Sequence, residues 1–184
     1  GKKPNFKRIE EIGKEGVIAS VIESTYAGDA RKMPSENVAR EMLKDVLLGT
    51  NNDNSLIIVT TFASHIARLK SIIEFGKMLN RKIVFLGRSL AKYTLAAENI
   101  GLVNFSKDVD IVKYGRQIEK RLKKIDKDRK KYLLVVTGHQ GEPKSVLSKI
   151  AKGELKFKLY PEDSVVFSCR TIPTQTNIEN RDAL

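Results

Sequence analysis

The chain has 184 residues, enough for one domain whose core needs neither disulfides nor a structural metal. Cys169 is the only cysteine, which excludes an intramolecular disulfide, and no group of Cys and His has zinc-site spacing. No apolar run reaches the roughly 18 to 20 residues of a transmembrane helix, so we expect a cytoplasmic protein without a membrane partner. The formal net charge of +12 favours nucleic acid as the partner.

Helical and strand patterns alternate along the chain. Residues 2–16 are basic and helix-like, and five short apolar, β-branched runs are predicted to be buried strands. These runs are residues 17–22, 56–60, 82–86, 132–136 and 164–167. Amphipathic helices are predicted at about residues 34–47, after residue 61, and at residues 90–99, 117–127 and 144–152. The alternation predicts an α/β fold, a Rossmann-like, doubly wound parallel sheet flanked by helices, in a single domain over residues 1–184.

Residues 121–131 form the most strongly charged run that we interpret separately from the candidate site. In residues 121–131 (RLKKIDKDRKK) lysines and arginines alternate with Asp126 and Asp128. Mixed charges of this kind are typical of a solvated helix face. We therefore assign this run to the surface and not to a binding site.

The residues after the predicted strands are the candidates for a binding site, because open parallel sheets bind ligands beyond the carboxyl ends of their strands. Glycines there let backbone N–H groups approach an anion, helix N-termini add positive charge, and arginines bind phosphate through two hydrogen bonds. The candidates for such a phosphate-binding site are Ser64, His65, Arg88, Ser89, Gly138, His139, Gly141, Ser168 and Arg170.

Several of these residues also have ordinary structural interpretations. His139 could be a loop histidine whose ring is satisfied by the backbone. His65 could be a solvent-facing residue in the first turn of a helix. Arg88 and Arg170 could each form a salt bridge with an acidic side chain. The sequence leaves these alternatives open.

Five short motifs occur in the order and approximate spacing of a known family. They are residues 23–26 (ESTY), 62–65 (FASH) with Arg68, 87–89 (GRS), 137–143 (TGHQGEP) and 172–173 (IP) with Asn177. Together they resemble the β-CASP domain of metallo-β-lactamase nucleases, and RNase J above all. Glu23 in place of aspartate, His139 in place of serine, and TQTN after Pro173 favour an archaeal type.

The resemblance implies a zinc-dependent ribonuclease that processes and degrades RNA as a 5′-to-3′ exonuclease, with endonuclease cleavage left open. Its two zinc ions would lie in the metallo-β-lactamase domain of the same parent chain, held by a His-x-His-x-Asp-His motif that this sequence lacks. Because the chain also begins with Gly1, we expect an excised fragment that holds no metal and is inactive alone.

The resemblance also implies a catalytic role and a set of partners. The carboxylate of Glu23 would orient a metal-binding histidine or the attacking water, although it could instead cap its own turn or pair with a lysine. Single-stranded RNA would be held by its 5′-monophosphate. The parent enzyme would be dimeric, and we expect the fragment to be monomeric.

Two other classes of function, a free-standing binding module and an unrelated nucleotide enzyme, are alternatives to a ribonuclease fragment. A free-standing module could bind nucleic acid or a nucleotide phosphate with the same residues and without catalysis, and its affinity would fall with salt. An unrelated Rossmann-like nucleotide enzyme is disfavoured, because neither Gly-x-Gly-x-x-Gly nor Gly-Lys-Ser/Thr is present.

Overall fold

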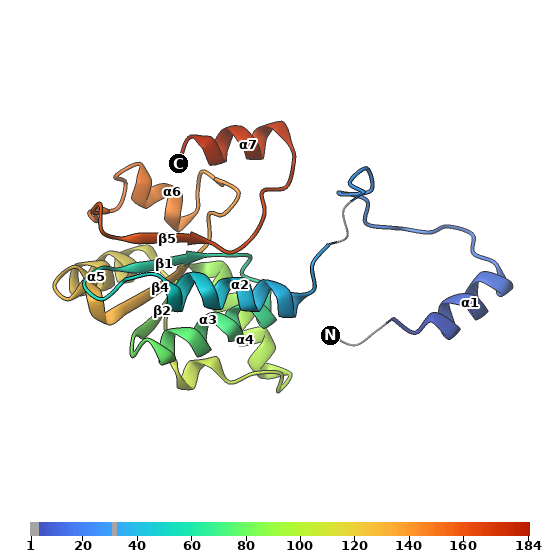
Figure 1. The fold of residues 1–184 in the computed structure, drawn as a ribbon, viewed down its shortest axis with the longest axis horizontal. Coiled ribbons are helices and arrows are strands. Elements are labelled where there is room, and N and C mark those ends of the chain that lie inside the picture. The colour runs from blue at the N-terminus through green and yellow to red at the C-terminus, as the bar shows by residue number, and fades with distance from the viewer. Residues whose placement is uncertain (1–3, 31–32) are drawn as a thin grey trace.

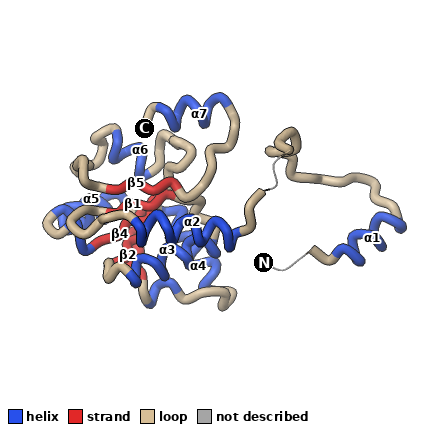
Figure 2. The backbone as a smooth tube through the Cα atoms, in the orientation of Figure 1, coloured by secondary structure: helices blue, strands red, loops and turns tan. Residues whose placement is uncertain are grey.

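The computed structural model describes residues 4–30 and 33–184, and its centre is a parallel sheet of five strands in the order β3-β2-β4-β1-β5 (Figure 1). The strands are β1 (Ile57–Thr60), β2 (Lys82–Leu86), β3 (Val109–Val112), β4 (Tyr132–Val136) and β5 (Ser164–Phe167). The parallel, helix-flanked sheet confirms the predicted fold class. Figure 2 shows the strands enclosed by helices.

Seven α-helices and two short 3-10 helices are present in the described residues. The α-helices are α1 (Phe6–Glu15), α2 (Glu36–Gly49), α3 (Ile66–Met78), α4 (Arg88–Asn99), α5 (Gly115–Asp126), α6 (Val146–Ala151) and α7 (Gln175–Asp182). The 3-10 helices are η1 (Phe105–Lys107) and η2 (Arg129–Lys131). Ser35 caps α2, since its hydroxyl accepts the backbone N–H of Val38 at 3.4 Å. None of these helices is long and apolar enough to cross a membrane.

Alternate strand residues build two cores, one on each face of the sheet. Ile57 and Val59 pack in a cluster with α2, α3 and α4, whereas Leu56 and Ile58 pack in a second cluster with α5 and α6. The side chains of a strand point alternately to opposite faces, so a near-continuous apolar run is needed to bury both. Each fully buried aliphatic side chain contributes roughly 1.5 to 3 kcal/mol.

The strand predicted at residues 17–22 is wrong. These residues form no strand, and the exposed fractions of Val17 and Val21 are 60% and 101%. A strand is stabilised by hydrogen bonds to a neighbour, and this segment runs beside no other strand. Residues 4–25 contain no buried side chain, and α1 lies apart from the sheet (Figure 1).

The sequence also missed β3 and α7. The β3 segment, VDIV, is a short edge strand with a charged residue, Asp110, in its middle. Asp110 is accommodated because it pairs with Arg121 of α5. The fifth strand of the sheet is therefore β3 and not the predicted segment at residues 17–22, and Tyr114 follows its carboxyl end.

Candidate nucleic-acid interface

The carboxyl ends of β1 and β4 mark the place where the chain changes direction across the sheet. From β1 the crossovers through α3 and α4 lead to β2 and β3, whereas from β3 the crossovers through α5 and α6 lead back to β4 and β5. β1 and β4 are neighbours, but their helices α3 and α6 cover opposite faces. In open α/β sheets a ligand crevice forms at such a switch point.

Two rings meet at this switch point. Phe62 follows β1 and His139 follows β4, and their ring centroids lie 3.9 Å apart at an interplanar angle of 71°. His139 is 1% exposed, and neither ring nitrogen has a hydrogen-bond partner among the described residues. The structure therefore does not show the alternative in which backbone groups form hydrogen bonds with the His139 ring.

Burial determines the charge of His139. Desolvation lowers its pKa, the carboxylate of Glu142 opposes that shift, and the charge of Arg181 lowers the pKa further. The imidazole is therefore neutral near pH 7, and its edge-on contact with Phe62 is an apolar packing contact.

Arg68 of α3 connects α2 to the end of β5. It is 7% exposed, and its Nε and Nη2 atoms each donate to the Glu36 carboxylate at 2.8 Å. Its Nη1 atom donates to the backbone oxygen of Ser168 and, at 2.8 Å, to the Ser168 hydroxyl. The hydrogen bond from Arg68 is the main cause of the lowered pKa of Glu36, with burial opposing it and the charges of Arg68 and His65 adding to it. Arg68 is thus neutralised and positions Ser168.

A cavity of about 820 Å³ opens beside this network, between residues 23–26, residues 33–34, α2 and the end of β5. Four predicted site residues line it, namely Glu23, His65, Ser168 and Arg170. The Nε2 atom of His65 lies 3.3 Å from the Glu36 carboxylate, and Arg170 is exposed. Much of the remaining wall is apolar and comes from α2, Phe62 and β5. The cavity therefore joins basic groups and the carboxylates of Glu23 and Glu36 to an apolar wall.

Glu23 lies on the turn that borders the cavity. Its Oε1 atom accepts the backbone N–H of Thr25 at 2.7 Å, and the hydrogen bonds with Thr25 lower the pKa of Glu23. The Tyr26 hydroxyl donates to the Thr171 backbone oxygen at 3.4 Å and ties this turn to the segment after β5. The carboxylate thus caps its own turn, as the structural alternative expects, and also borders the cavity.

The two predicted glycines of the β4 loop are required by close packing. A Cβ atom on Gly138 would lie 2.6 Å from the Ser145 hydroxyl, and one on Gly141 would lie 2.3 Å from the backbone of Asn180 in α7. Both glycines have positive φ, 128° and 72°. The structure places them against α6 and α7, and both are buried.

Two residues outside the predicted site, Gln140 and Arg181, fix the β4 loop. Gln140 is buried; its Nε2 atom donates to the Arg170 backbone oxygen at 2.9 Å, and its Oε1 atom accepts the Ile172 N–H at 2.7 Å. Arg181 of α7 donates to the His139 backbone oxygen at 2.9 Å and lies 3.4 Å from the Phe167 ring centroid. Gln140 stood inside the TGHQGEP motif, but nothing in the sequence indicated Arg181.

The structure divides the nine predicted RNA-site residues into groups. His65, Ser168 and Arg170 line the cavity, and Ser64 directly precedes His65 at the start of α3. In the β4 loop, Gly138 lies against the start of α6, whereas His139 and Gly141 lie under α7. Arg88 and Ser89 lie in the first turn of α4, after β2, and do not line the cavity. Within the described part of the chain Arg88 forms no ion pair, so its salt-bridge alternative is not observed.

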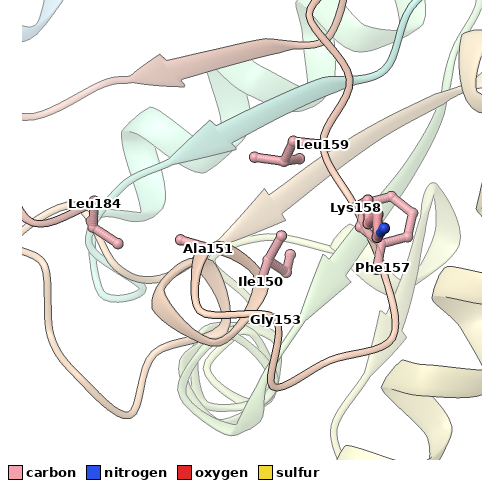
Figure 3. A pocket seen from close by; sticks show the side chains of 7 residues that line it. All are labelled: Ile150, Ala151, Gly153, Phe157, Lys158, Leu159 and Leu184. Carbon is pink, nitrogen blue, oxygen red and sulfur yellow. The ribbon is translucent and has the colours of Figure 1, made fainter.

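A second hollow, of about 380 Å³, shares no lining residue with this cavity (Figure 3). Side chains of α6, of residues 157–159 and of Leu184 line it, and Lys158 is the charged side chain among them. Leu184 packs against the core on this face of the sheet. Without converging polar groups the hollow is a packing defect at the edge of the core.

Across residues 4–30 and 33–184, no three His, Cys, Asp or Glu side chains gather where they could hold a metal ion. The described residues therefore offer no group of ligands that fits the two zinc ions that the resemblance implies. Their geometry provides positive charge, hydrogen-bond groups and an apolar wall.

Comparison with known proteins matches this architecture to one family. The family model described as "Ribonuclease J, beta-CASP domain" matches residues 54–181, which include all five strands and the loops after them. The chain belongs to the ribonuclease J β-CASP domain family. The predicted resemblance is thereby confirmed.

Curated relatives named ribonuclease J extend the match to the rest of the chain. The Pyrococcus abyssi protein is 44% identical over 184 residues, all of this chain and 40% of its own length. The Methanocaldococcus jannaschii protein is 42% identical over 98% of this chain and 41% of its own length, and the Sinorhizobium meliloti protein is 32% identical over 90% and 28%. The chain spans about two fifths of the two archaeal ribonucleases J and is more similar to them than to the bacterial one, in line with the archaeal leaning of its motifs.

Proposed function

We propose that this chain is the part of a ribonuclease J-like enzyme that holds single-stranded RNA, and that its cavity binds the 5′-monophosphate end. The observation that carries the proposal is the convergence of Arg170 and His65 on one cavity at the ligand-binding edge of the sheet. A guanidinium binds phosphate through two charge-assisted hydrogen bonds, which makes the exposed Arg170 the principal phosphate ligand.

The shape and chemistry of the cavity fit a nucleotide. Arg68 is neutralised by Glu36, so it is the exposed Arg170 that offers an uncompensated positive charge at the end of β5. The ring of Phe62 on the wall is 37% exposed and provides a surface for a base. Proteins that hold single-stranded RNA combine a basic groove with aromatic stacking in this way.

The hydrolytic step is assigned to another part of the parent enzyme. Two zinc ions, when bound there, would supply the hydroxide that attacks the phosphodiester. The residues of this chain would bind the RNA and fix its register, and Glu23, at the cavity rim, would orient the attacking water or a metal-binding histidine of that part. The isolated chain is proposed to have no hydrolytic activity.

Exposed apolar residues provide a surface for that other part. Met42 and Val46 of α2 are exposed, as are Val17, Ile18 and Val21 of the N-terminal segment. Exposed apolar residues on these two parts of the chain are candidates for an interaction site. Because the chain spans about two fifths of its archaeal relatives, we assign this surface to contact with the metallo-β-lactamase domain of the same parent chain.

The proposal is tested by measuring the dissociation constant of this chain for one single-stranded RNA with a 5′-monophosphate or a 5′-hydroxyl. We expect the phosphate to strengthen wild-type binding about tenfold or more, because hydrogen bonds to charged groups contribute about 1.5 to 3 kcal/mol. Arg170→Gln should abolish this gain and His65→Gln should reduce it. The RNA should be recovered uncut with and without added zinc.

Lys152→Gln is the matched control, because it removes one exposed positive charge on the α6 side of the molecule, outside the cavity. It should retain the full gain from the 5′-phosphate. Equal binding of the two RNAs by the wild type would overturn the 5′-phosphate site. Metal-dependent cleavage by the isolated chain would overturn the assignment of catalysis to another domain.

A further inference from the structure

The solvent-facing side of α5 carries a row of positive charges that the candidate site does not use. Five exposed residues form this row, which we call the α5 stripe: Arg116, Lys120, Lys123, Lys124 and Lys127. At about 100° per residue they fall within roughly a 100° arc of the helix surface, and at 1.5 Å per residue they extend over about 16 Å. The opposite side of α5 is buried in the core through Ile118, Leu122 and Ile125.

The acidic residues near α5 leave the stripe uncompensated. Asp110 pairs with Arg121, Asp126 pairs with Arg129, and Asp128 pairs with Lys131 at 2.5 Å. Each of these carboxylates is engaged by a cation outside the stripe, and Glu119 flanks the stripe on one side. Among the described residues no member of the stripe forms an ion pair. The alternation of charges in the sequence is thus separated in space into satisfied pairs and a free basic face.

The stripe is separate from the cavity and adjoins an exposed aromatic side chain. α5 packs on the sheet face opposite to α2, α3 and α4, whereas the cavity is lined by α2. Tyr114, the residue before α5, is 54% exposed, and the Lys113 ammonium lies 5.2 Å from its ring centroid. Positive charge beside an exposed aromatic ring is the arrangement that binds single strands without sequence preference.

We propose that the α5 stripe, with Tyr114 at its start, is a second contact surface for the RNA backbone, distinct from the 5′-end site. It binds successive phosphates through charge and adds affinity independent of sequence and of the 5′ group. The choice of RNA over an acidic protein rests on the proposed function. The stripe gives the domain a second RNA-binding surface, on the face of the sheet opposite to the helices that line the cavity.

The test uses single-stranded RNA with a 5′-hydroxyl, so that the 5′-phosphate site makes no contribution. The triple variant Lys120→Gln, Lys124→Gln, Lys127→Gln is compared with Lys70→Gln, Lys152→Gln, Lys156→Gln, which removes the same charge from exposed positions elsewhere. We expect the stripe variant to bind at least about tenfold more weakly at low salt. Its plot of log K against log salt should become less steep by about 2, since each of the three lost phosphate contacts on a single strand contributes about 0.7 to the steepness.

The control variant should keep the wild-type slope, and thermal unfolding should confirm that both variants are folded. Equal losses in the two variants would show that only net charge matters and would overturn the proposal. Unchanged RNA binding with lost binding of polyglutamate would overturn it in favour of an acidic protein partner. The increment from a 5′-phosphate should persist in the stripe variant. If the wild type gains no affinity from a 5′-monophosphate but the stripe variant still binds RNA more weakly, the proposed 5′-end site is wrong and the stripe proposal stands.

Discussion

At the scale of single residues, the Asp163 carboxylate joins the beginnings of two neighbouring strands. It accepts the backbone N–H of Leu56 at 3.0 Å and that of Tyr160 at 2.9 Å, and it pairs with Arg129. The Asp163 side chain is 2% exposed, and the Arg129 guanidinium lies 4.5 and 4.3 Å from the ring centroids of Phe157 and Tyr160. Burial raises the pKa of Asp163, but the hydrogen bonds from Arg129 and the two N–H groups lower it by more.

Replacing this carboxylate should therefore destabilise the fold in a pH-dependent way. Asp163→Asn should lower the free energy of unfolding at pH 7 by about 3 kcal/mol, because it leaves the buried Arg129 guanidinium with the exposed Asp126 carboxylate as its remaining ionic partner. The lowered pKa means that the carboxylate stabilises the fold above about pH 4 and that this contribution is lost as the pH falls through the folded-state pKa. Urea unfolding at pH 7 and at about pH 3 measures the loss of stability and its dependence on pH. Asp45→Asn, at an exposed position, is the control. An equal loss at both pH values would contradict a role for the charge.

At the scale of elements, α7 is held against the β4 loop by its fit to a glycine. The Gly141 backbone has a φ of 72°, and a Cβ atom there would collide with Asn180 of α7. Gly153 has nearly the same φ, 69°, but a Cβ atom on Gly153 would meet no heavy atom within 4 Å. The two glycines therefore separate backbone strain from collision with α7.

Gly153→Ala should cost about 1 to 2 kcal/mol, the strain of a left-handed residue with a side chain. Gly141→Ala should cost a further 1 to 3 kcal/mol or so, because it adds overpacking against α7. Denaturant unfolding measures the difference, and faster hydrogen exchange of the α7 amides in Gly141→Ala alone would locate it. Equal costs for the two variants would show that α7 is not held by this contact.

At the scale of the whole molecule, the N-terminal segment does not contribute to the core. Residues 4–25 are exposed throughout, although they include the apolar side chains of Phe6, Ile9, Ile18 and Ile22. Deletion of residues 1–22 should change the unfolding temperature by less than about 2 °C, since under 1 kcal/mol of packing is lost. Calorimetry measures this change. A large fall would mean that the segment packs on the sheet in solution.

The same deletion tests the expected monomeric state. The full chain should elute from a sizing column at the volume of a monomer, and a stable dimer of the full chain would contradict that expectation. Because exposed apolar surface favours association, the deleted chain should remain monomeric to still higher concentrations. A stable dimer of the deleted chain would contradict the expectation and would place a dimer contact on the folded body.

The sequence by itself determined the parallel α/β class and four of the five strands, because a strand buried on both faces must be an almost continuous apolar run. It also determined the family, through motifs such as residues 137–143. It did not show that residues 17–22 lack a neighbouring strand, or that Val109–Val112 has one, because strand pairing joins residues distant in the sequence.

Only the tertiary structure decided which candidates lie together. Arg170 and His65 meet at one cavity, Gly138 and Gly141 lie under helices, and Arg88 stands apart on α4, because the crossovers set which strand ends are neighbours. It likewise decided that several charges of residues 121–131 form ion pairs, whereas Lys123, Lys124 and Lys127 lie on a free basic face. Composition fixes how many charges a chain carries, whereas helical geometry and packing fix which of them remain unpaired.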